Sequence, residues 1–217
     1  MRSLKLVFLI VLFPAMIFAQ EGLTVIDQQK IIDDEINSVI YKDKAFKQPV
    51  SDDPDWKKIR RNISKKYRNA NAGMIINASR IKYYKIKNEW DKFSDAYLTS
   101  LEKYDPVEKM TNYRQLSWSV NNTLYSLIFK NVNDKKLLLR AAIQSKKIIE
   151  NPNSIRAGEP ADQYSANNID TYSNLLYKAG KSKKAIEWQT KAVEYTNGEE
   201  KEFKSNLEKM KKGEKTW

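Results

Sequence analysis

Two groups of carboxylates have the residue types and spacing that could support catalysis. One is the run Asp33, Asp34 and Glu35, and the other comprises Asp52, Asp53 and Asp55. Two carboxyl groups held across a cleft can serve as general acid and general base in hydrolysis. Both groups also lie where the polar face or the first turn of a helix favours acids. The pattern therefore favours a non-enzymatic chain over a hydrolase.

The absence of two residue types narrows the chemistry further. The 217 residues contain neither cysteine nor histidine. This excludes disulfides, thiol nucleophiles, zinc sites built from Cys and His, and triads that use His as the base, within this chain. We expect no metal and no cofactor.

The first 19 residues have the pattern of a secretory signal. Arg2 and Lys5 form a basic start, Leu6 to Phe13 is apolar, and Ala19 is a small residue at a plausible cleavage position. The apolar stretch is shorter than the roughly 20 residues that span a bilayer. We therefore expect a secreted protein, periplasmic or extracellular, with no transmembrane anchor after cleavage.

The charge is basic but dispersed. The formal net charge is +12, which attracts a chain to nucleic acid, anionic membranes or acidic polymers. The lysines are spread along the chain and mixed with Glu and Asp, as on solvated helix surfaces, and no dense basic cluster with interleaved aromatics stands out. Secretion argues against nucleic acid as a partner.

The remaining pattern predicts helices only. Pro and Gly number six each, too few for a protein rich in tight turns. We expect an N-terminal helix over 24–41, a linker to residue 53, and an all-α helical domain over 54–217. Apolar residues at i, i+3 and i+4 predict the helices of this domain. The first covers 54–68, and the second follows a break near 69–73 and ends at Lys87. The others are expected over 89–104, 108–131, 134–150, 169–179, 181–196 and 199–212. The polar segment 151–168 is expected to be a surface loop, functional or disordered.

A spacing of roughly 45 residues separates three predicted turns, as in solenoids of helical pairs. The turns lie at Asn88, Asn133 and Gly180. Small residues follow twelve positions after each turn: Ser100, Ser145 and Ala192. We therefore predict a right-handed stack of helix-turn-helix pairs, with 199–212 as a capping helix and Trp217 either packed back on that cap or free.

The segment from Ile169 to Asn197 resembles a tetratricopeptide repeat. The small residues and the turn glycine typical of that repeat are matched here by Ser173, Gly180, Ala185 and Ala192. Residues 55–217 are more widely similar to the C-terminal helical region of secreted bacterial thioredoxin-like proteins, through DWKKIRRNISKKY, YYKIKNEWDKF, DTYSNLLYKAGKSKKAIEWQTKAVE and EKMKKGEKTW. The segment before Asp55 is too short for a thioredoxin domain and has no cysteine, so the resemblance implies the helical module without redox activity.

The tetratricopeptide resemblance also implies a ligand groove lined by the first helix of each pair. The matching positions are Lys82, Lys85, Thr123, Lys130, Asn167, Asp170, Asn174, Tyr177 and Lys178. Four lysines among them favour an anionic ligand, such as an acidic peptide or a C-terminal carboxylate. The implied function is a binding module or scaffold for a protein or peptide in the bacterial envelope. The alternative is binding of an anionic polysaccharide or a membrane surface through a basic face, and the oligomeric state stays open.

Overall fold

In a computed structural model of the chain, the regular secondary structure of the described residues is entirely helical. The described residues are 25–43, 48–50, 53–106, 109, 113–151 and 163–217. Within these ranges there is no β-strand, and one isolated antiparallel bridge joins Tyr41 to Pro49. The all-α class is confirmed. The predicted signal segment 1–19 lies outside the described residues.

The chain divides into two compact units. Unit 1 ends at Asn71 and unit 2 begins at Ala72. Unit 1 contains α1 (Val25–Ile40) and α2 (Trp56–Lys66), so α2 falls in unit 1 although the sequence analysis assigned it to the helical domain.

In unit 1, each of the two helices buries isoleucines at helical spacing. α1 buries Ile32, Ile36 and Ile40, and α2 buries Ile59 and Ile63. A polar contact adds to them: the carboxylate of Glu35 on α1 accepts hydrogen bonds from the Lys66 ammonium (2.7 Å) and the Tyr67 hydroxyl (2.9 Å). The end of α2 is therefore fixed to the middle of α1.

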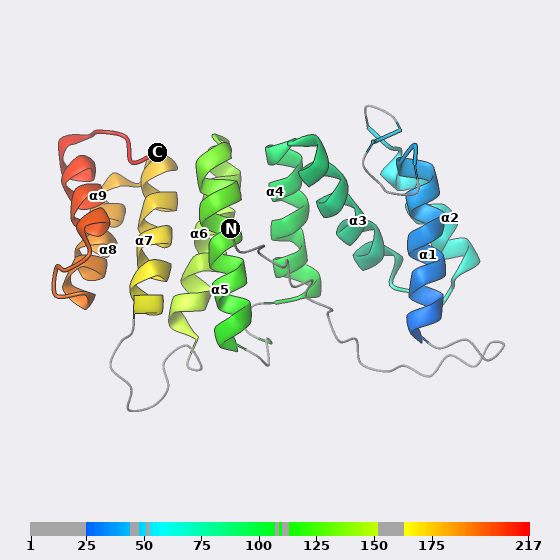
Figure 1. The fold of residues 1–217 in the computed structure, drawn as a ribbon, viewed down its shortest axis with the longest axis horizontal. Helices are drawn as coiled ribbons and strands as arrows, with labels where there is room; N and C mark the ends of the chain where they lie inside the picture. The colour runs from blue at the N-terminus through cyan, green and yellow to red at the C-terminus, as the bar shows by residue number, and fades with distance from the viewer. Residues whose placement is uncertain (1–24, 44–47, 51–52, 107–108, 110–112, 152–162) are drawn as a thin grey trace, which may run out of the picture. The chain divides into compact units, whose positions relative to one another are not determined.

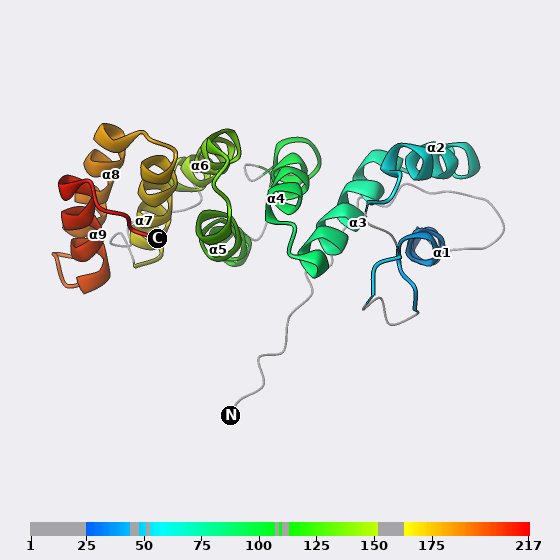
Figure 2. The same ribbon diagram turned by 90° about the horizontal axis from the view of Figure 1, so that it is seen from above.

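Unit 2 is a succession of helices in which consecutive members pack side by side. In chain order they are α3 (Ala72–Lys87), α4 (Trp90–Thr99), the π-helical η1 (Ser100–Tyr104), α5 (Tyr113–Thr123), the π-helical η3 (Leu124–Phe129), α6 (Lys135–Glu150), α7 (Gln163–Lys178), α8 (Ser182–Tyr195) and α9 (Lys201–Lys212). η1 continues α4, and η3 continues α5. α3 packs on α4, α6 on α7, α7 on α8, and α8 on α9. Figure 1 and Figure 2 show α7 between α6 on one side and α8 with α9 on the other.

Left-handed residues end the helices at two of the three predicted turns. Asn88 (φ +55°) ends α3, and Gly180 (φ +84°) ends α7. Glycine and asparagine tolerate this backbone region at the least steric cost. The third turn works differently, because Asn133 lacks a positive φ and the Asp134 carboxylate caps α6 by accepting from the backbone N–H groups of Lys136 and Leu137.

One helix starts earlier than the sequence predicts. Residues 163–168 were expected to belong to a loop, but they form the first turns of α7. Ala166 is fully buried there and packs with Ile169, Ala192 and Phe203. The loop prediction was wrong for these residues because α7 has neighbours on several sides, so its polar residues also face protein and no apolar stripe marks the helix. Residues 152–162 lie outside the described ranges.

Candidate functional site

The nine predicted groove residues differ widely in exposure. Three side chains are exposed: Lys82, Lys85 and Lys130. Thr123 and Asn167 are half-buried. The remaining four, all on α7, are buried: Asp170, Asn174, Tyr177 and Lys178. The role of this set as a ligand groove stays a prediction.

One part of the set comes together around aromatic rings from η3, α7 and the C-terminal residues. We call Tyr125, Phe129, Tyr177, Lys178 and Trp217 the tail cluster. Tyr125 stacks on Phe129 with ring centroids 5.5 Å apart. The Trp217 ring meets Phe129 at 6.3 Å and Tyr177 at 6.2 Å, both in edge-to-face geometry.

The Lys178 ammonium lies inside this cluster. Its nitrogen is 5.5 Å from the Phe129 ring centroid and 5.3 Å from that of Trp217, and it donates a 2.6 Å hydrogen bond to the Phe129 carbonyl oxygen. Burial, with a smaller contribution from Lys215, lowers the pKa of Lys178. A cation between two rings with one hydrogen bond is held by cation–π attraction in place of a carboxylate partner.

Lys130, another predicted groove residue, extends the tail cluster at its edge. Its ammonium lies 5.1 Å from the Tyr125 ring centroid, and the side chain is exposed. Lys215 is placed similarly, 5.9 Å from the Trp217 centroid. The face formed by η3 and the end of α7 therefore presents aromatic surface bordered by cations.

The C-terminal residues reach this face by reversing direction after α9. Gly213 ends α9 in the left-handed region (φ +74°), and the Glu214 N–H donates to the Lys209 carbonyl oxygen. The chain then runs back across to α7, as Figure 1 shows. Trp217 does pack on the protein, but its ring contacts belong to η3 and α7 and not to the capping helix, because the turn at Gly213 carries the tail past α9.

A second part of the predicted set forms a buried polar cluster that joins α7 to α8 and α9. Asp170 is 4% exposed, and its Oδ1 accepts from Gln189 Nε2 at 2.7 Å and from Asn206 Nδ2 at 3.2 Å. Gln189 also donates to the Phe203 carbonyl oxygen and accepts from the Ser173 hydroxyl. Here the predicted groove position Asp170 stabilises helix packing.

Burial governs the protonation of Asp170. Desolvation raises its pKa to about 6, with a further contribution from the negative charge of Glu202, while the Gln189 and Asn206 amides oppose the rise. Glu202 in turn accepts a hydrogen bond from the Tyr125 hydroxyl at 3.0 Å. The pKa of that hydroxyl is raised, chiefly by burial.

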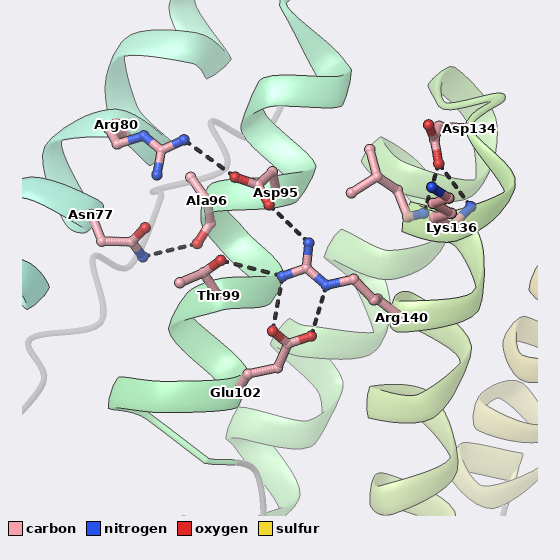
Figure 3. A network of polar contacts seen from close by, with 10 residues as sticks. Asn77, Arg80, Asp95, Ala96, Thr99, Glu102, Asp134, Lys136 and Arg140 are labelled. Atoms are coloured by element: carbon pink, nitrogen blue, oxygen red, sulfur yellow. Dashed lines mark hydrogen bonds and ion pairs between the residues drawn. The ribbon is translucent and has the colours of Figure 1, made fainter. Parts of the chain in front are cut away.

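An arginine network joins α6 to α4 and η1 (Figure 3). The Arg140 guanidinium donates to both carboxylate oxygens of Glu102, at 2.9 and 2.8 Å, and to Asp95 at 2.8 Å. Asp95 also accepts from Arg80 of α3 at 3.2 Å. A bidentate guanidinium fixes geometry, so this network sets how neighbouring helices align.

At least three of the six carboxylates that could have supported hydrolysis have structural contacts, and Asp52 lies outside the described residues. Glu35 is bonded to Lys66 and Tyr67, and Asp33 accepts from the Gln29 amide. Asp55 caps α2 by accepting from a backbone N–H. Nowhere in the described part of the chain do three Asp, Glu, His or Cys side chains gather closely enough to hold a metal ion.

None of the helices in the described ranges has both the length and the apolar character that crossing a bilayer requires.

The sequence analysis missed a concentration of positive charge on α2. From residue 56 to residue 68 the chain carries seven bases and no acid: Lys57, Lys58, Arg60, Arg61, Lys65, Lys66 and Arg68. All seven side chains are exposed. Counting acids within a short window would have found this run, whereas the mixture of charges over the whole chain concealed it.

Comparisons with protein-family models, with curated proteins and with solved structures found no match. The resemblance to tetratricopeptide repeats and to the thioredoxin-like C-terminal region therefore stays a prediction from the sequence.

Proposed function

We propose that unit 2 is a tetratricopeptide-repeat-like stack of helical pairs that binds an extended segment of a protein or peptide partner, and that the chain is a secreted, non-enzymatic module of the bacterial envelope. The face formed by η3 and the end of α7 is the proposed binding site. Lys130, Tyr177 and Lys178 are the predicted groove residues that contribute to it.

The observation that carries the proposal is that this face already holds a non-helical segment of the chain itself. Residues 214–217 are non-helical, and their last side chain inserts an indole ring between Phe129, Tyr177 and the Lys178 ammonium. Trp217 remains 44% exposed, so the contact is at the surface. Aromatic rings and lysines that hold this segment have the chemistry to hold a similar one from a partner.

The helical pairs give the proposal its wider support. Asn88 and Gly180 end the first helix of two pairs in the same left-handed conformation. Ser145 and Ala192, which have equivalent positions after their turns, are both fully buried. Equivalent small residues at helix contacts are what a repeat needs in order to stack its helices closely.

The proposed ligand is a peptide segment that pairs an aromatic residue with acidic neighbours. The aromatic ring would take the position of Trp217. The acids would face Lys130, whose ammonium group lies 5.1 Å from the Tyr125 ring centroid and stays in place when the tail is displaced. Removing the tail should therefore strengthen the binding of such peptides by freeing the rings.

The test is a peptide array in which aromatic and acidic residues are varied, probed with three forms of the chain. They are the intact chain, the chain ending at Gly213, and the shortened chain with Lys130→Glu. The shortened chain should bind acidic aromatic peptides more tightly than the intact chain does, and Lys130→Glu should weaken that binding. Lys184→Glu on α8, another exposed lysine, is the matched control. Peptide binding that is absent from the shortened chain, or equally affected by both charge reversals, would contradict the proposal.

A further inference from the structure

The strongest unexplained feature outside the proposed peptide site is the charge on α2. Six exposed bases, five on α2 and Arg68 just after its end, have no ion pair with any described residue: Lys57, Lys58, Arg60, Arg61, Lys65 and Arg68. The seventh, Lys66, is bonded to Glu35 and its ammonium also lies 5.2 Å from the Tyr67 ring centroid. One basic residue of this run therefore fixes α2 to α1, and the other six face solvent.

Several of these bases disfavour their own helix, although Lys65 lies in the last turn, where the dipole favours a cation. Lys57, Arg61 and Lys65 follow one another at four-residue spacing, which places like charges next to each other along one face. Lys57 and Lys58 also lie in the first turn, where the helix dipole disfavours cations. A solvated surface would be more stable with acids interleaved, so helix stability does not account for this charge pattern.

The apolar side of α2 determines how a ligand can approach. Ile59 and Ile63 are buried, at 8% and 1% exposure. Lys57, Arg61 and Lys65 point away from that side, about 6 Å apart along the helix axis, at a rise of roughly 1.5 Å per residue. The helix thus offers a convex cationic ridge whose two isoleucines are covered, while Trp56 at its start is half-buried.

We propose that α2 attaches the protein to an anionic lipid surface through its bases alone, without insertion. A convex row of separate cations does not enclose a single small anion. It suits a planar array of negative headgroups, where each basic residue near the surface adds about fivefold to binding. Arginine adds paired hydrogen bonds to phosphate oxygens, which a lysine cannot match in geometry. This site is independent of the proposed peptide site in unit 2.

The experiment measures co-sedimentation of the chain from Gln20 onward, which retains every residue that the structure describes. The probes are vesicles of phosphatidylcholine alone and vesicles with equal parts of phosphatidylglycerol. The test variant carries Lys57→Gln, Arg61→Gln and Lys65→Gln, and its far-UV circular dichroism should match the parent because all three side chains are exposed. The control variant carries Lys181→Gln, Lys183→Gln and Lys184→Gln, which remove the same charge from exposed positions of unit 2.

The parent chain should bind only the anionic vesicles, and the α2 variant should lose binding on the order of 100-fold, since three bases contribute about fivefold each. The control variant should lose much less. Salt of about 1 M should release the protein, because it shortens the screening length to about 3 Å.

Three results would overturn the proposal. Equal losses from the two variants would assign binding to the overall charge. Attachment that survives about 1 M salt would mean that apolar residues insert. A polymer would be the ligand of this helix if the chain bound a soluble acidic polysaccharide such as polygalacturonate more tightly than the anionic vesicles, and if the α2 variant lost that binding to the same extent.

Discussion

Replacing Asp170 by asparagine should change the pH dependence of stability in a defined direction. The carboxylate is 4% exposed and has two amide donors, Gln189 and Asn206, on its Oδ1. Asparagine keeps an oxygen for these donors and removes the charge.

The size of the effect follows from the pKa of Asp170. Burial raises it from 3.8 to about 6, so the folded protein holds this proton more tightly than the unfolded chain does. The stability that the proton contributes is complete below pH ~4 and is lost as the pH rises through about 6. A pKa difference of this size corresponds to about 3 kcal/mol. Asp170→Asn should therefore match the parent near pH 4 and exceed it by up to about 3 kcal/mol at pH 8.

The measurement is urea unfolding by far-UV circular dichroism at a series of pH values between 4 and 8, for the parent and the variant. The difference between their free energies of unfolding isolates Asp170, because every other group titrates in both proteins. Glu208→Gln is the matched control, since Glu208 on α9 is exposed and forms only a surface pair with Lys211 at 3.3 Å. Its difference from the parent should vary little over the same pH range.

A difference that stays constant with pH would refute the reasoning, because it would mean that burial does not raise the pKa of Asp170. A variant that is less stable than the parent at pH 8 would refute it more strongly. The two amides would then stabilise the charged carboxylate by more than desolvation disfavours it, and Asp170 would act as an ionised acceptor that joins the three helices.

Three further substitutions test the turns, the arginine network and the tail. Gly180→Ala should reduce stability by about 1–2 kcal/mol in urea unfolding, because an L-residue is disfavoured at φ +84°. The control Gly73→Ala in α3 should raise stability by about 0.5–1 kcal/mol. Equal effects of the two substitutions would contradict the role of the turn. Arg140→Ala and Glu102→Ala should show a coupling energy of about 1 kcal/mol in a double-mutant cycle. The partial exposure of both side chains keeps this energy small. Independent effects of the two substitutions would argue against the bidentate contact. Trp217→Ala should lower stability by about 2 kcal/mol, since roughly half of the indole is covered, and a variant as stable as the parent would mean that the tail is not held on η3 and α7.

The helices and most turns were predictable because they depend on local signals. The observed bounds of α8 and α9 lie within a few residues of the expected ones, since apolar residues at helical spacing mark the buried side of a helix with one exposed face. Gly180 was predictable for a similar reason, because a single residue meets the steric demand of that turn. The start of α7 was not, because the burial of Ala166 depends on Ala192 and Phe203, which lie in later helices.

The sites were less predictable because they depend on residues that are distant in the sequence. Lys178 could be named from the resemblance, but its place between Phe129 and Trp217 follows from a tail that reverses direction at Gly213. Trp217 was expected on the capping helix, the nearest element in sequence. No local signal specifies that an aromatic residue will pack on a helix 40 residues earlier, so the tail cluster required the three-dimensional arrangement.

Lysine illustrates why net charge could not identify the partner. Lys178 has its charge covered by two rings and a carbonyl, and its pKa is lowered by burial. Lys66 is bonded to Glu35. Lys57 and Lys65 have neither contact and remain in solvent. The last kind is best placed to meet an anionic surface, because the Lys66 charge is paired with a carboxylate and Lys178 is buried. A charge of +12 counts all of these equally, whereas their surroundings differ, and on those surroundings we propose α2 for an anionic surface and the tail cluster for short-range contact with a peptide.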